Sequence, residues 1–166
     1  MSDEVRFRSV NHYPASVNGP SVIARLLDGL GFRFYWATEG LTLEDYSFSP
    51  GNGCQSIREL VGHIWGLVNW VCLATYGQGE RRPQEAQLQR EHVLGLLHKL
   101  RDHFASLSDQ ELSAITIDSR PFWHLINGPI SDALTHIGQI NSFRRLAGNP
   151  AKRSRPFTCM PPDKEA

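Results

Sequence analysis

The fold of this chain is decided by residues 56–77, SIRELVGHIWGLVNWVCLATYG. Ser56 and Glu59 have the spacing of a capping box, in which the serine hydroxyl and the glutamate carboxylate each accept a hydrogen bond from the other residue's backbone amide. Five apolar side chains then recur at helical spacing: Leu60, Ile64, Leu67, Val71 and Ala74. Gly77 follows Tyr76 at a position where helices commonly end. This pattern predicts a helix from about residue 56 to residue 76.

The apolar part of this helix indicates burial among other helices. Its most apolar stretch, residues 61–76, contains His63 and Asn69 and is shorter than the roughly 20 residues that a bilayer span requires. We therefore expect no membrane-spanning helix here. We expect this helix to be the most buried element of the protein.

Three further segments show helical periodicity of apolar residues. They cover about residues 20–40, 83–106 and 129–146. Pro20 or Ser21 is well placed to begin the first of them, and Gly148 followed by Pro150 ends the last. Four amphipathic segments, with no strand alternation and no internal repeat, predict an all-α fold, a four-helix bundle. It forms a single domain over residues 1–166, with irregular ends at about 1–18 and 150–166.

The composition argues against several classes of function. The 166 residues carry 17 Lys and Arg against 17 Asp and Glu, so the formal net charge is zero. This balance disfavours a protein that acts through a net field on nucleic acid or on an anionic membrane. The cysteines, Cys54, Cys72 and Cys159, are odd in number and form no CxxC pair, which disfavours a disulfide framework. The first residues lack the apolar core of a secretory signal, so we expect a cytoplasmic protein.

Two of the predicted helices each carry a histidine on a side expected to face the interior. His63 stands among apolar residues, where an imidazole needs partners for its ring nitrogens. Asp132 and His136 are four residues apart and so share one face of the last helix. Facing helices in bundles build metal sites from such groups. Alternatively, His63 is a core histidine bonded to a backbone carbonyl or to a buried side chain, and the Asp–His pair is a solvated contact.

The same two helices resemble those of a known family. SIRELVGHIWGLVNWV, residues 56–71, is similar to the second helix of the DinB-like four-helix-bundle proteins, whose histidine in the pattern L-x-x-H-I binds a divalent metal. DALTHIGQINSFRRLAGNP, residues 132–150, resembles their final helix, where a histidine followed by x-Gly-Gln ends an H-xxx-H ligand pair. The resemblance runs from the start of the first helix through Pro150.

The resemblance implies that His63 and His136 are metal ligands. The family's first histidine of the last-helix pair falls on Asp132, and related mycothiol-dependent isomerases look similar in using an acidic residue there. A carboxylate can ligate zinc or nickel, so the predicted site is His63, Asp132 and His136 with one of these ions as cofactor. Asp132 could instead be a cap or a supporting group. His124 is the alternative third ligand.

Three protein ligands leave a position at the ion for water or a thiolate, which becomes a nucleophile at neutral pH. The resemblance thus implies a metal-dependent enzyme, either an S-transferase that uses a low-molecular-weight thiol or a hydrolase. It also implies a small-molecule substrate and a homodimer. The alternative is a bundle without catalytic activity that binds a small ligand or dimerises.

Other polar and aromatic residues receive simpler interpretations. Gln139 and Asn141 either support the ligands, contact substrate or are ordinary amides. Three histidines of the third helix are expected on its solvated face: His92, His98 and His103. Cys72 is expected to be a small core residue. A run of aromatics on the first helix must point to several faces, and any that point outward favour a partner helix: Phe32, Phe34, Tyr35 and Trp36.

Overall fold

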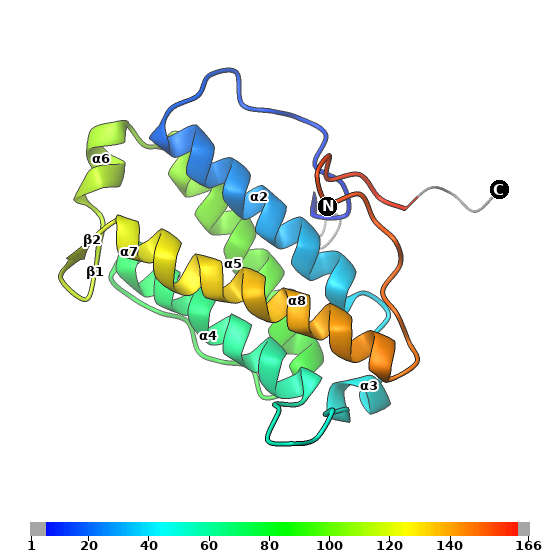
Figure 1. The fold of residues 1–166 in the computed structure, drawn as a ribbon. Helices are drawn as coiled ribbons and strands as arrows, with labels where there is room; N and C mark the ends of the chain where they lie inside the picture. Colours follow the sequence, from blue (N-terminus) through cyan, green and yellow to red (C-terminus); the bar gives the residue numbers. More distant parts are fainter. Residues whose placement is uncertain (1–5, 163–166) are drawn as a thin grey trace.

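The computed structural model describes residues 6–162 and is mostly helical, which confirms the all-α class (Figure 1). Its long helices are α2 (Gly19–Thr38), α4 (Ile57–Tyr76), α5 (Ala86–Ser106) and α8 (Ser131–Leu146). Shorter elements are α3 (Leu43–Ser47), α6 (Asp109–Ala114), strands β1 (Thr116–Ile117) and β2 (Arg120–Pro121), α7 (Trp123–Leu125) and the π-helical turn η1 (Ile126–Ile130). Strand in the described chain is confined to this small antiparallel hairpin.

The described parts of the two expected irregular ends are largely without regular structure. Residues 7–18 hold no helix or strand, and residues 150–162 hold an isolated bridge between Arg155 and Met160. The remainder of both ends lies outside the described residues.

The helix boundaries follow the chemistry visible in the sequence. Ser56 Oγ accepts a hydrogen bond from the Glu59 amide, and Glu59 Oε2 accepts one from the Ser56 amide at 2.7 Å. Gly77 closes α4 in the left-handed conformation, with φ of 73°. Asn18 and Ser21 form an equivalent reciprocal cap at the start of α2. Local capping therefore marks the beginnings of α2 and α4, and at the start of α2 the Gly19 amide also donates to Asp109 Oδ1 at 2.9 Å.

The segment between α4 and α5, residues 77–85, determines how the long helices run. The Glu80 amide donates to Asn69 Oδ1 at 2.7 Å, and the Arg82 guanidinium lies over the Trp65 ring, so this segment returns along α4 towards its start. As a result α5 runs parallel to α4. The chain runs in the opposite direction along α2 and α8 (Figure 1).

Each of the long helices packs against two others. α2 contacts α5 and α8, and α4 contacts the same two helices, so that the four surround a shared apolar core. α4 and α8 are antiparallel neighbours whose seam faces solvent. The seam between α2 and α8 lies on the other side of α8.

The most buried long helix is α2, so the expectation that residues 56–76 form the most buried element is wrong. Thirteen of the 20 residues of α2 are buried, against ten of 20 in α4. The N-terminal segment covers α2, because Phe7 is fully buried against the core and Trp36 Nε1 donates to the Arg8 carbonyl at 3.2 Å. The aromatic run on α2 is buried in its own chain: Phe32, Phe34, Tyr35 and Trp36. These four side chains therefore offer no exposed face to a partner helix.

Within residues 6–162, no helix is both long and apolar enough to cross a membrane. The three cysteines are free thiols, with Cys72 and Cys159 buried and Cys54 exposed. Burial raises the pKa of the Cys72 thiol to about 12, so this residue is a neutral part of the core, as expected.

Candidate metal centre

Three side chains from α4 and α8 meet at the seam between these helices. His63 Nε2 lies 3.2 Å from Asp132 Oδ2, and His136 Nε2 lies 3.4 Å from Asp132 Oδ1. The two imidazole rings are nearly perpendicular, with centroids 4.6 Å apart. One potential ligand atom from each of the three residues lies within 4.8 Å of the other two. The structure thus brings together the three residues that the sequence and the family resemblance select.

The start of α8 places the carboxylate. Gly128 adopts a non-helical conformation, with φ of −92° and ψ of −106°, and Pro129 follows it, so the chain is redirected one turn before Asp132. Asp132 then falls in the first turn of α8, where backbone N–H groups favour a negative charge. His136 is one turn further along and therefore shares its face.

The site is more exposed than an interior histidine pair. The side chains of His63, Asp132 and His136 are 43%, 46% and 15% exposed, so the expectation of a buried ring is wrong for His63. His63 belongs to the solvent-facing stripe of α4, which also contains Gly66, Trp70 and Leu73. Because two residues of that stripe are large and apolar, the sequence pattern resembles a buried face.

Gln139 holds the His136 ring in one tautomer. Its Oε1 lies 2.7 Å from His136 Nδ1, and a carbonyl oxygen can only accept, so Nδ1 carries the proton. Nε2, the other ring nitrogen of His136, is the atom that faces Asp132. A hydrogen bond to the outer ring nitrogen is the usual support for a histidine that ligates a metal. The contact of Gln139 with His136 is the one expected of a supporting residue, which is one of the three roles that the sequence left open.

The residues present fit a divalent ion. In a tetrahedral zinc site with bonds of about 2.0–2.1 Å, neighbouring ligand atoms are about 3.3–3.4 Å apart. Asp132 Oδ2 lies 3.2 Å from His63 Nε2 and Asp132 Oδ1 lies 3.4 Å from His136 Nε2, close to that spacing, and one atom from each of the three residues lies within 4.8 Å of the others. Two imidazoles and a carboxylate suit zinc or nickel. In the described chain, both ion-pair contacts of Asp132 are with imidazoles and none is with Lys or Arg.

His124, the alternative third ligand, is not part of this cluster. It lines a small cavity of about 190 Å³ together with Trp70, Arg120 and the start of the kinked turn at Asn127 and Gly128. Trp70 is seven residues after His63, about 10 Å along α4. The cavity therefore lies further along the same seam. The sequence alone does not indicate this cavity, because its lining joins residue 70 of α4 with residues 117–128.

The remaining candidate residues have other partners. Asn141 lies away from the cluster and lines a separate cavity between α2 and α8. The histidines of α5, predicted on a solvated face, are each partly exposed, and each also contacts another side chain. Their partners are Trp65 for His92, Asp102 for His98 and Tyr76 for His103.

Comparison of the chain with protein-family models, with curated proteins and with solved structures found no match. Function is therefore inferred from the fold and from the side chains themselves.

Proposed function

We propose that this protein is a divalent-metal-dependent enzyme of the DinB-like four-helix-bundle type. In this proposal His63, Asp132 and His136 hold one zinc or nickel ion, and the reaction is thiol transfer or hydrolysis of a small molecule. The observation that carries it is the convergence of two imidazole nitrogens on one carboxylate, at 3.2 and 3.4 Å, from two separate helices.

The arrangement of the helices supports the proposal. The histidine motif of residues 56–71 lies on α4 and the motif of residues 132–150 on α8, and these helices are neighbours in space. The two motifs are therefore adjacent although about 70 residues separate His63 from Asp132 in sequence. A bundle whose ligands come from facing helices is a common architecture for metal sites.

The side chains of the site have separable roles in this mechanism. A divalent ion, when bound, supplies Lewis acidity that lowers the pKa of a neighbouring water or thiol towards neutrality. His63 and His136 present neutral nitrogen donors, and the Asp132 carboxylate offsets part of the positive charge of the ion. Gln139 keeps His136 in the required tautomer. The partial exposure of His63 and Asp132 leaves the seam open to substrate.

The small cavity along the seam suggests where substrate lies. Trp70 provides an apolar surface, while Arg120 and His124 provide polar groups, within about 190 Å³. This volume is below the usual range for drug-sized ligands, so the cavity suits a small substrate or one part of a larger one. Asp118 and Arg120 both line the cavity, so it offers a substrate one group of each charge.

Metal content and activity together test this proposal. Untagged protein from cells grown with added zinc and nickel is analysed for metal, beside the His63→Ala and His136→Ala variants. We expect close to one equivalent in the wild type, little in either variant, and loss of thiol-transfer or ester-hydrolysis activity with the metal. A folded wild type that retains no metal would favour the alternative of a bundle without catalytic activity.

A further inference from the structure

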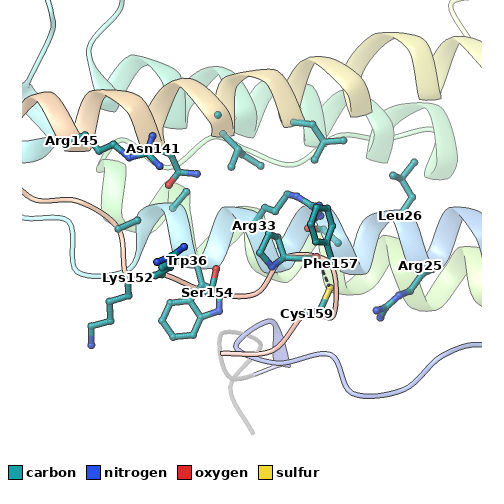
Figure 2. A pocket seen from close by; sticks show the side chains of 18 residues that line it. Arg25, Leu26, Arg33, Trp36, Asn141, Arg145, Lys152, Ser154, Phe157 and Cys159 are labelled. Carbon is teal, nitrogen blue, oxygen red and sulfur yellow. Dashed lines mark hydrogen bonds between the residues drawn. The ribbon is translucent and has the colours of Figure 1, made fainter. Parts of the chain in front are cut away.

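A second cavity, of about 1100 Å³, lies between α2, α8 and the C-terminal segment, residues 151–160 (Figure 2). Its apolar lining includes Leu26 and Trp36 from α2 and Leu134 and Ile137 from α8. It lies on the side of α8 away from the His63–Asp132–His136 cluster. Its volume is slightly above the roughly 300–1,000 Å³ that is usual for small-molecule sites in proteins.

The C-terminal segment forms one wall of this cavity and is held in place. The Val10 amide donates to the Cys159 carbonyl at 2.9 Å, and Arg155 and Met160 pair their backbones across a tight turn. Cys159 is buried, and burial raises the pKa of its thiol, so at neutral pH it is an uncharged part of the wall. The wall is therefore built by long-range contacts and is part of the fold.

Five cationic side chains line the cavity and no Asp or Glu does. They are Arg25, Arg33, Arg145, Lys152 and Arg153. Figure 2 shows cations from all three walls: Arg25 and Arg33 from α2, Arg145 from α8, and Lys152 from the C-terminal segment. In a chain whose formal net charge is zero, this is a strong local excess of positive charge.

None of the five cations of the cavity has a carboxylate partner in the described chain, and three of them, Arg145, Lys152 and Arg153, are exposed. Arg33 donates to the Gly29 carbonyl at 3.2 Å and Arg25 to the His12 carbonyl at 3.4 Å, and both contacts are with neutral groups. Within residues 6–162, Arg145, Lys152 and Arg153 form no ion pair. By contrast, Arg101 pairs with Asp28 at 3.1 Å and Arg90 with Glu39 at 2.8 Å.

The cavity also offers a neutral hydrogen-bonding group. The amide of Asn141 lies beside Arg145 on α8 and lines the cavity, with no hydrogen bond to another side chain or to backbone in the described chain (Figure 2). Phe157 lines the mouth and is 92% exposed, so its ring is available to cover a bound molecule. An apolar lining with unpaired cations and a free amide is complementary to a molecule with an apolar body and an anionic head.

We propose that this cavity binds a small organic anion, in which a carboxylate or phosphate group is carried on an apolar body. Arg33 and Arg145 bind the anionic head from the two helices, and the apolar side chains of α2 and α8 contact the body. This site is separate from the candidate metal centre and does not depend on it.

Calorimetric titration of the full chain with four probes tests the ligand class. Octanoate and octyl phosphate carry both features, octanol lacks the charge, and acetate lacks the apolar body. We expect one-to-one binding of octanoate or octyl phosphate, at least about tenfold tighter than that of octanol or acetate. Which of the two anions binds better identifies the head group. Equal binding of octanol and octanoate would overturn the proposal.

Paired substitutions locate the binding site. Arg33→Gln with Arg145→Gln should weaken binding of the preferred anion at least tenfold. The matched control is Arg58→Gln with Arg81→Gln, two exposed arginines outside the cavity, and its affinity should be unchanged. If the cavity double variant and the control double variant bind the preferred anion with equal affinity, the proposal is contradicted.

A third substitution covers the case in which the charge variants fold poorly. A Cβ added at Gly138 meets nothing within 4 Å, so Gly138→Leu places an apolar side chain in the cavity without a clash at its Cβ. It should change the affinity for the preferred anion at least threefold while the helix is retained, because leucine favours helix over glycine. Gly66→Leu on α4, whose Cβ also meets open space, is the control and should bind normally.

Two further measurements exclude other binding modes. A carboxylate could bind to an ion at His63 and Asp132, so octanoate is also titrated into the His63→Ala variant, where we expect unchanged affinity. Loss of binding in the His63→Ala variant would overturn the proposal.

A ten-nucleotide oligothymidylate should bind at least tenfold more weakly than octyl phosphate, and tighter binding would instead identify a nucleic-acid surface.

Discussion

The protein contains two Asp–His pairs with the same helical spacing and different surroundings. On α5, His98 Nε2 lies 3.1 Å from Asp102 Oδ2, and on α8, His136 Nε2 lies 3.4 Å from Asp132 Oδ1. Both pairs are four residues apart, and the carboxylates are 49% and 46% exposed. Spacing and exposure therefore do not distinguish the pairs.

Their neighbours do distinguish them. The Asp102 carboxylate accepts hydrogen bonds from Arg6 at 2.7 and 3.0 Å and from Arg101 at 3.1 Å. The Asp132 carboxylate instead faces the His63 imidazole at 3.2 Å. A carboxylate bonded to two guanidinium groups is already neutralised, whereas one between two imidazoles is available to a cation. The comparison teaches that the contacts across helices, and not the spacing within one helix, give a site its chemistry.

Matched substitutions at the two aspartates are expected to show the largest difference. Asp132→Asn should reduce zinc affinity by more than about 100-fold, because even groups that only support ligands contribute about 10- to 100-fold. Asp102→Asn should leave zinc affinity unchanged. Competition with a chromophoric zinc chelator measures both. Equal affinities in the two variants would remove Asp132 from the ligand set.

Removal of Arg101 should cost the most stability. This residue pairs with Asp28, whose side chain is only 3% exposed, as well as with Asp102. Arg101→Leu leaves the Asp28 carboxylate buried without its partner, and we expect a loss of about 3–5 kcal/mol in the free energy of unfolding by urea. Adding Asp28→Asn should recover more than half of this loss, because no buried charge remains. A single variant that loses less than about 1 kcal/mol would show that the pair is not structural.

Gln139→Leu should have an intermediate effect on the metal site. Without its hydrogen bond, His136 is free to adopt either tautomer, so we expect zinc affinity to fall about tenfold while one equivalent still binds. Asn141→Leu, two residues further along α8 and outside the cluster, is the control and should bind zinc normally. If the two variants behave alike in chelator competition, Gln139 has no specific role at the site.

The smallest expected effect is the pH dependence contributed by Asp102. Partial burial alone raises its pKa, but hydrogen bonds from Arg6 and Arg101 outweigh burial and hold the pKa below the usual 3.8. A carboxyl whose folded-state pKa is lowered stabilises the fold above its unfolded pKa, and this contribution is lost as pH falls through the folded value.

Asp102→Asn should therefore flatten the decline of Tm below about pH 5, by an amount that corresponds to no more than about 1 kcal/mol for so exposed a group. Thermal unfolding at pH 2.5 to 7 measures the effect. Addition of 1 M NaCl should shrink the difference between wild type and variant, because salt screens the arginine–carboxylate attraction. Parallel curves for the two proteins at low salt would contradict this account.

The helices of the fold could be predicted from the sequence because their determinants are local. The reciprocal cap at Ser56 and Glu59, the stop at Gly77 and the break at Gly128 and Pro129 lie within a few residues of the boundaries that they set. The return of residues 77–85 along α4 could not be predicted, since it depends on long-range contacts such as that of Arg82 with Trp65.

The candidate site was predictable only in part. Spacing placed Asp132 and His136 on one face, but the approach of His63 depends on which helices are neighbours. The placement of His63 beside these two residues was inferred from the family resemblance. In the structure the three side chains meet at the solvent-facing seam between α4 and α8, whereas the sequence predicted the interior of the bundle. The organic-anion cavity escaped prediction because residues from α2, α8 and residues 151–160 are all needed to form it.

Anomalous diffraction from crystals of the zinc- or nickel-loaded protein tests the central claim most directly. Data collected on either side of the absorption edge of the metal locate the ion independently of any activity. The account predicts one strong peak bonded to His63 Nε2, an Asp132 oxygen and His136 Nε2, at about 2.0–2.2 Å from each. A metal-loaded crystal with its peak elsewhere, or with the three side chains joined only to one another, would contradict it.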